Sequence, residues 1–139
     1  MSRPVILVVE DEALIMLMLA DCLDAYGYEV LTAPNARSAL EILRTHDTIA
    51  VLFTDLDLRS HISGTVLAHL AREEHPGIGV IYTSGRYPGV ARDNAVRGGR
   101  FLPKPYRVPT LLDEIEIALS WRTPHQDRWT RTQASPSAA

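Results

Sequence analysis

The chain has 139 residues, of which 46% are hydrophobic and 22% are charged, values typical of a single soluble globular domain. Its net charge of −3 is uneven: residues 1–121 carry 11 basic against 16 acidic side chains, and residues 122–139 carry three against one. An acidic body argues against nucleic acid as the main partner. No apolar run is long enough to cross a membrane, and the single cysteine, Cys22, fits a reducing cytoplasm.

Short apolar runs and amphipathic stretches alternate along the chain. The apolar runs are typical of strands covered on both faces, and we expect strands at 5–9, 28–32, 49–54, 79–83 and 100–102. The amphipathic stretches predict helices. The first follows residue 12 and ends at Tyr26-Gly27, and the others cover 35–45, 65–74, 90–97 and 111–121. This alternation predicts a parallel sheet with helices on both faces.

Two apolar groups are predicted on the first helix. The group expected to be buried comprises Ile15, Met18, Leu19, Cys22, Leu23 and Tyr26. A second group, Leu14, Met16 and Leu17, lies away from it. Packing against neighbouring helices is favoured over the alternative, a docking surface for a protein partner. Beyond residue 121 the chain is rich in Thr, Pro, Ser, Gln and Ala, which predicts a flexible tail over 122–139 after a domain at 1–121.

Acidic residues follow two of the predicted strands. Glu10-Asp11 ends the first strand, Asp55 ends the third, and Asp57 comes two residues later. Each can be read as an ordinary helix-start or turn residue. In an open α/β sheet, however, strand ends meet at one edge, where several carboxylates repel one another unless a cation neutralises them. A Mg²⁺ site suited to phosphoryl transfer onto a carboxylate explains the group better.

A hydroxyl group and an ammonium group follow two other predicted strands. The fourth strand ends in Thr83-Ser84-Gly85, and the fifth leads to Lys104, the only lysine among fourteen basic residues. Where arginine is the usual cation, a lone lysine indicates a site that needs a compact ammonium. Both segments can also be ordinary loops, but together with the acidic residues they favour a functional site.

Four sequence segments, Val-Val-Glu-Asp-Glu, Phe-Thr-Asp, Tyr-Thr-Ser-Gly and Phe-Leu-Pro-Lys-Pro, occur in this order along the chain. Together they resemble the receiver domain of two-component response regulators, over roughly residues 4–121. The resemblance implies a flavodoxin-like (βα)5 fold, a three-layer sandwich with a five-stranded parallel sheet in the order 2-1-3-4-5.

The resemblance also implies roles for the acidic residues. Asp55 is the expected nucleophile, which attacks a phosphohistidine and becomes an aspartyl phosphate. Asp11 is expected to hold Mg²⁺ together with Asp55, with Glu10 helping directly or through water. Asp57 is expected to offer its backbone carbonyl to the metal. Glu10 stands where the family more often has Asp, and its longer side chain leaves direct and water-mediated coordination both open.

The same resemblance implies a switch. Lys104 is expected to pair with Asp55 and then with a phosphoryl oxygen, while Ser84 donates a hydrogen bond to another. Phe101 matches the aromatic residue that swings inward when the switch residue moves. The sequence leaves Thr83 open as the switch hydroxyl, although the following Gly85 favours Ser84. The Lys104–Pro105 peptide bond is expected to be cis.

The expected partners are a histidine kinase or histidine phosphotransfer protein, docking beside the first helix, and a downstream protein target. No nucleic-acid or membrane partner is expected, and a homodimer is left open. The spacing between Ser84 and Lys104 is short for the family, so the fourth helix is expected to be reduced or tilted.

Two other functions fit parts of the sequence. The segment 53–57 resembles the Asp-x-Asp motif of haloacid-dehalogenase-like phosphatases, but Arg59 stands where Thr or Val is usual. The other is a degenerate receiver that binds a partner without phosphorylation, against which the complete acidic site argues. The sequence favours a signalling phosphoacceptor that catalyses only its own phosphorylation and dephosphorylation, rather than an enzyme.

Overall fold

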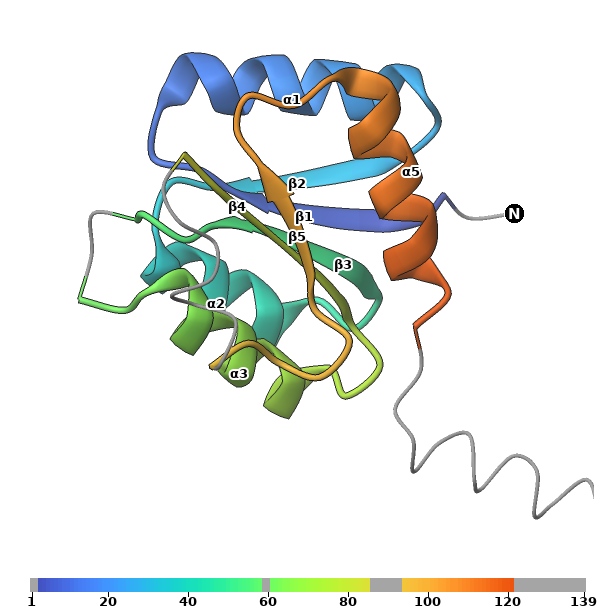
Figure 1. Ribbon diagram of the computed structural model, residues 1–139. Helices are drawn as coiled ribbons and strands as arrows, with labels where there is room; N and C mark the ends of the chain where they lie inside the picture. The colour runs from blue at the N-terminus through green and yellow to red at the C-terminus, as the bar shows by residue number, and fades with distance from the viewer. Residues whose placement is uncertain (1–2, 59–60, 86–93, 122–139) are drawn as a thin grey trace, which may run out of the picture.

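The computed structural model describes residues 3–58, 61–85 and 94–121. Its centre is a five-stranded sheet in the order β2-β1-β3-β4-β5, in which every neighbouring pair is parallel, as predicted (Figure 1). The central strands bury nearly every residue because helices cover both faces. The strands are β1 (Val5–Val9), β2 (Glu29–Ala33), β3 (Ile49–Asp55), β4 (Gly79–Ser84) and β5 (Arg100–Pro103).

Within the described residues, two helices lie on each face of this sheet, which gives three layers (Figure 1). One face is covered by α2 (Ala36–Thr45) and α3 (Gly64–Glu74), and the other by α1 (Ala13–Ala25) and α5 (Val108–Leu119). The side chains of Asn35 and Ser63 each accept a hydrogen bond from a backbone N–H in the first turn of α2 and α3, respectively. These caps fix where both helices begin.

The predicted fourth helix, 90–97, falls mostly outside the described residues. Its described part, 94–97, is a turn and irregular backbone, so the helix prediction is wrong there. The reason is a tertiary contact: the buried Val96 donates its backbone N–H to the Tyr82 hydroxyl at 3.0 Å. The predicted tail, 122–139, also lies outside the described residues.

The predicted burial of α1 is only partly correct. Leu19 and Leu23 are buried, but Met18 is 63% and Tyr26 61% exposed. Met18 lies about 100° around the helix from Leu19, which turns it away from the sheet. Tyr26 is the C-cap residue, and its backbone is no longer helical.

The second apolar group on α1 does not pack as expected. Leu14 is 70% and Leu17 58% exposed, so the prediction that they pack against neighbouring helices is wrong. Of this group, only Met16 is partly covered. With Met18, the first two turns of α1 therefore present an apolar surface made of Leu14, Leu17 and Met18.

At the amino ends of the strands the helices approach the sheet closely. A Cβ at Gly79 would overlap the backbone of Ala118 in α5. Helix α5 ends at Leu119, two residues earlier than predicted, and Trp121 stacks on the Arg72 guanidinium, whose central carbon lies 3.5 Å from the centre of the indole ring. Gly98 lies directly against the same indole ring. This end of the sheet is closed by tight packing.

Candidate functional site

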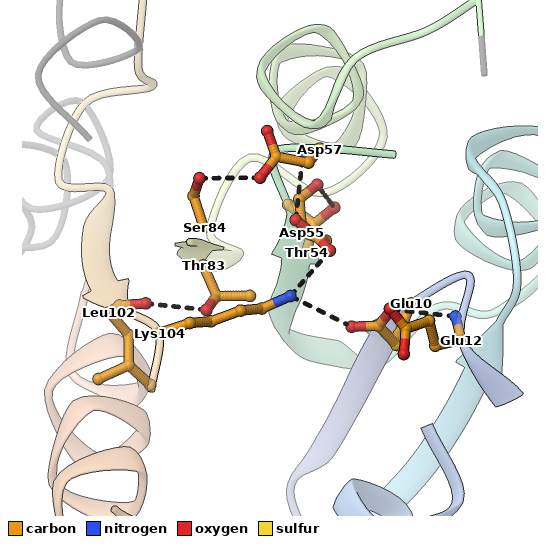
Figure 2. Close-up of polar contacts among 9 residues, drawn as sticks. All are labelled: Glu10, Glu12, Thr54, Asp55, Asp57, Thr83, Ser84, Leu102 and Lys104. Atoms are coloured by element: carbon orange, nitrogen blue, oxygen red, sulfur yellow. Dashed lines mark hydrogen bonds and ion pairs between the residues drawn. The ribbon is translucent and has the colours of Figure 1, made fainter. Parts of the chain in front are cut away.

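The polar side chains predicted to form a site come together at the carboxyl ends of the strands. Glu10 follows β1, Asp55 ends β3, Ser84 ends β4 and Lys104 follows β5 (Figure 2). Glu10, Asp55 and Ser84 are all buried, although most buried side chains of this chain are apolar. Burying ionisable groups is costly unless they are paired. Such groups gathered at one sheet edge therefore indicate function.

Three carboxylates form a compact group in this site. Oxygen atoms of Glu10, Asp11 and Asp55 all lie within 4.8 Å of one another. Burial raises the pKa of Glu10 above its ordinary value, and the charge of Asp55 raises it further. An all-oxygen group of this size fits Mg²⁺, which binds proteins through one or two carboxylates and keeps several waters. Asp11, Asp55 and Glu10 are the residues that would hold it.

Lys104 supplies a positive charge to this group. Its Nζ lies 3.1 Å from Asp55 Oδ2, to which it donates a hydrogen bond, and 3.8 Å from Glu10 Oε1 (Figure 2). Burial alone would lower the pKa of Lys104, but its hydrogen bond to Asp55 and the neighbouring negative charges raise that pKa above its ordinary value. The ammonium therefore stays charged at neutral pH and partly offsets the repulsion among the carboxylates.

Glu10 also has the plain structural role that its position suggests. Its Oε2 accepts a hydrogen bond of 3.0 Å from the backbone N–H of Glu12, just before α1 begins. The Glu12 side chain makes no capping hydrogen bond of its own. Glu10 therefore orients the start of α1 and faces the acidic group at the same time. A role at the helix start and a role in the site are thus compatible.

Asp55 is held in place from several sides. Its Oδ1 accepts a hydrogen bond of 2.8 Å from the backbone N–H of Asp57, and its Oδ2 faces Lys104. The first residue of α3 is Gly64, where a Cβ would overlap the Asp55 carbonyl group. Glycine therefore lets α3 start directly against the backbone of Asp55.

The two candidate switch hydroxyls have different partners. Thr83 Oγ1 donates to the backbone carbonyl of Leu102 at 2.8 Å, and so links β4 to β5. Ser84 Oγ points into the site and donates to Asp57 Oδ2 at 2.9 Å (Figure 2). This arrangement favours Ser84 as the switch hydroxyl. The Asp57 side chain is a partner that the sequence did not indicate, because only its backbone carbonyl was expected to act.

Phe101 lies on the far side of β4 from the acidic group. Its ring is 5.1 Å from that of Tyr82, centre to centre, and both rings line a small hollow next to Ser84 that has no room for water. The sequence did not indicate a role for Tyr82. The only available signal was an aromatic residue directly after the aliphatic pair Val80-Ile81 of the strand.

The chain segment after β5 packs next to the site. The Lys104–Pro105 bond is cis, as predicted, and the Lys104 backbone N–H donates to the Ser84 carbonyl at 2.9 Å. Tyr106 stands edge-on to Phe53, and burial raises its pKa to about 12. No sequence pattern pointed to Tyr106. It packs against the apolar cluster that contains Phe53, close to the charges of Glu10 and Asp55.

Comparison with known proteins identifies the family. The chain matches the response regulator receiver domain over residues 6–116. It is 32% identical over 118 residues to the nitrogen assimilation regulatory protein NtrX of Azorhizobium caulinodans. The matched region covers 82% of this chain and 26% of that protein. It is 28% identical over 116 residues to the transcriptional regulatory protein PdtaR of Mycobacterium tuberculosis, covering 83% of this chain and 56% of that protein.

Solved structures agree with this match. The fold superposes on a response regulator receiver protein from Sinorhizobium medicae WSM419 with a TM-score of 0.80 and 26% identity, covering 84% of this chain and 94% of that one. The chain therefore belongs to the response regulator receiver domain family of two-component signalling. It spans about a quarter and about half of the length of the two curated relatives.

This membership separates the chain from the haloacid-dehalogenase-like phosphatases that its Asp-x-Asp segment resembled. Among the helices in the described ranges, none is both long and apolar enough to cross a bilayer.

Proposed function

We propose that this chain is a phosphoryl acceptor, in which Asp55 receives a phosphoryl group from a histidine kinase or a histidine phosphotransfer protein. The observation that carries the proposal is the surrounding of Asp55: a buried carboxylate 3.1 Å from the only lysine of the chain, with Glu10 and Asp11 beside it. A structural aspartate does not require this arrangement, whereas a nucleophile that becomes a charged acyl phosphate does.

The transfer forms one bond and breaks another. A carboxylate oxygen of Asp55 attacks phosphorus as the P–N bond of the phosphohistidine breaks, and the electron pair stays on the imidazole nitrogen of the donor. The product is an acyl phosphate on Asp55. Bound Mg²⁺, held by Asp11, Asp55, the Asp57 backbone carbonyl and, directly or through water, Glu10, would neutralise charge on the oxygens. Lys104 would stay charged and pair with a phosphoryl oxygen.

The switch follows from the added charge. A phosphoryl group brings about −1.5 to −2 charges and strong acceptor oxygens, which attract the hydroxyl of Ser84 and the ammonium of Lys104. Movement of Ser84 changes the hollow that it shares with Phe101, and the ring of Phe101 can then turn inward. The surface over β4 and β5 thereby takes two states, one of which binds a downstream protein target.

The exposed surface of Leu14, Leu17 and Met18 on α1 supports a docking site for the phosphoryl donor. These side chains belong to the first two turns of α1, and α1 begins at the carboxyl end of the sheet, where β3 ends in Asp55 (Figure 1). An exposed apolar group of this kind is typical of protein–protein contact. We place the reaction in the cytoplasm, where histidine kinases act, and expect no turnover of a separate substrate.

The experiment is to measure intact mass after incubation with acetyl phosphate, with and without Mg²⁺. We expect a Mg²⁺-dependent gain of one phosphoryl group, about 80 Da, in the wild type. Asp55→Asn should show no gain, and Asp47→Ala, which removes an exposed carboxylate far from the site, should behave as the wild type. If the wild type gains nothing, even with a histidine kinase as donor, the chain is a binding module that works without phosphorylation.

A further inference from the structure

The hydroxyl of Ser84 is already engaged in the resting protein. Its Oγ lies 2.9 Å from Asp57 Oδ2, and the hydroxyl donates to that carboxylate (Figure 2). Ser84 is 5% exposed whereas Asp57 is exposed, so the bond is partly buried and lies at the edge of the site. A hydrogen bond to a charged acceptor is about twice as strong as one between neutral groups. The side chain of Asp57 therefore helps to fix the resting position of Ser84.

A serine hydroxyl has one proton to donate. It cannot donate fully to Asp57 and to a phosphoryl oxygen on Asp55 at the same time. We propose that Asp57 is a positioning residue whose carboxylate holds Ser84 in the unswitched state, so that the phosphoryl group must compete with Asp57 for the same proton. This inference rests on the proposed phosphorylation of Asp55 and adds a role for the Asp57 side chain.

The position of Asp57 makes this competition direct. Its backbone N–H donates to Asp55 Oδ1 at 2.8 Å, so Asp57 is tied to the carboxylate that would carry the phosphoryl group. Asp57 also contributes to the negative field around Lys104. A phosphoryl group on Asp55 therefore repels the Asp57 carboxylate while it attracts the proton of Ser84. Both effects act to break the Ser84–Asp57 hydrogen bond.

Removing the Asp57 carboxylate should make the switched state easier to reach. The probe is beryllofluoride with Mg²⁺, a phosphoryl analogue that binds without covalent transfer, and the measured quantity is its half-saturating concentration. We expect Asp57→Ala to lower that concentration about tenfold, which is about 1.4 kcal/mol. Asp57→Asn keeps an acceptor oxygen without the charge and should give a smaller change.

A lower concentration could also reflect only the loss of a negative charge near an anionic probe. The variants Ser84→Ala and Asp57→Ala/Ser84→Ala separate the two causes in a double-mutant cycle. If Asp57 acts through Ser84, Asp57→Ala should have a much smaller effect once the hydroxyl is gone. An equal effect with and without the Ser84 hydroxyl would overturn the proposal, as would an unchanged or higher concentration in Asp57→Ala.

The wild type and the three variants of this cycle also test the resting hydrogen bond without any phosphoryl analogue. Urea unfolding in the absence of Mg²⁺ should show favourable coupling between the two side chains, equivalent to about a fivefold change in the unfolding equilibrium. Coupling near zero contradicts the inference. If the wild type binds neither phosphoryl group nor beryllofluoride, the proposed function fails and this inference fails with it. If it binds them but the cycle shows no coupling, only the role of Asp57 fails.

Discussion

The two ends of the sheet bury different kinds of group. At the amino ends, Gly79 lets α5 pack directly on β4, and Trp121 covers Arg72. At the carboxyl ends, Glu10 and Asp55 are buried close to each other. The first arrangement stabilises the fold, whereas the second brings like charges together and costs stability. The candidate site thus lies at one end of strands whose other end is closely packed.

Two partly buried cations, Arg72 and Lys104, illustrate the difference. Burial lowers the pKa of Arg72 to about 10, and no carboxylate of the described residues forms an ion pair with it. Its Nε donates to the Ile78 carbonyl, and its Nη2 is buried with no hydrogen-bond partner among the described residues. Lys104 experiences the same kind of burial, but its acidic neighbours reverse the direction of the pKa shift. Arg72 is therefore a packing residue, whereas Lys104 is matched to negative charge.

The largest effect is expected from closing the space at the amino end. Gly79→Ala should lower the free energy of unfolding by about 3 kcal/mol, because the added methyl group overlaps the Ala118 backbone, which cannot move without shifting α5. The measurement is urea unfolding. Gly85→Ala is the matched control, since a Cβ there meets nothing within 4 Å, and a similar loss in both variants would refute the packing argument.

A smaller loss is expected from uncovering Arg72. Trp121→Ala removes the ring that stacks on the guanidinium, and the free energy of unfolding should fall by about 2 kcal/mol. Ile117→Ala, which truncates a side chain that is 44% exposed near the same helix end, should change the free energy of unfolding by less than about 1 kcal/mol. If the two variants are equally stable, the stack with Arg72 contributes nothing.

At the carboxyl end the effect of a substitution on stability should depend on Mg²⁺. Lys104→Met removes the only ammonium near Glu10 and Asp55 among the described residues, so the Mg²⁺-free protein should lose about 1.5 kcal/mol. Saturating Mg²⁺ should restore most of this loss, because it neutralises the same carboxylates. Thermal unfolding with and without Mg²⁺ checks both parts, and a loss that Mg²⁺ leaves unchanged would contradict the proposed metal site.

The smallest expected change in stability is an increase. Asp11→Asn removes one of three crowded carboxylates and should raise the free energy of unfolding without Mg²⁺ by about 0.5 kcal/mol. The variant should also lose the stabilisation by Mg²⁺, which for the wild type is about 1.4 kcal/mol at about ten times the dissociation constant. Calorimetric titration with Mg²⁺ provides the second test. Unchanged affinity for Mg²⁺ would remove Asp11 from the metal site.

The sheet was predictable because its signal is local. The apolar runs of β1 and β3 are long enough to identify buried strands, and the residues that follow them necessarily meet at one edge. The gathering of Glu10, Asp55 and Lys104 at that edge therefore follows from the order of the strands. Their roles were implied by the family resemblance rather than by the spacing alone.

What the sequence did not predict depends on tertiary contacts. Residues 94–97 follow a helical pattern, but the hydrogen bond between Val96 and Tyr82 holds them in another conformation. The exposure of Met18 depends on how α1 is rotated against the sheet, which its many apolar residues do not specify. The Ser84–Asp57 contact depends on side-chain geometry between the end of β4 and the turn after β3, and it has no sequence signature.

The contact of Lys104 with Asp55 has a practical consequence for following this site in solution. Lys104 is the only lysine in the chain, so an amine-specific reagent can modify only this side chain and the α-amino group. An ammonium held 3.1 Å from a carboxylate and kept protonated is a poor nucleophile. The rate of chemical labelling at a single peptide would then report how firmly the pocket holds its cation, without introducing a dye or a tag.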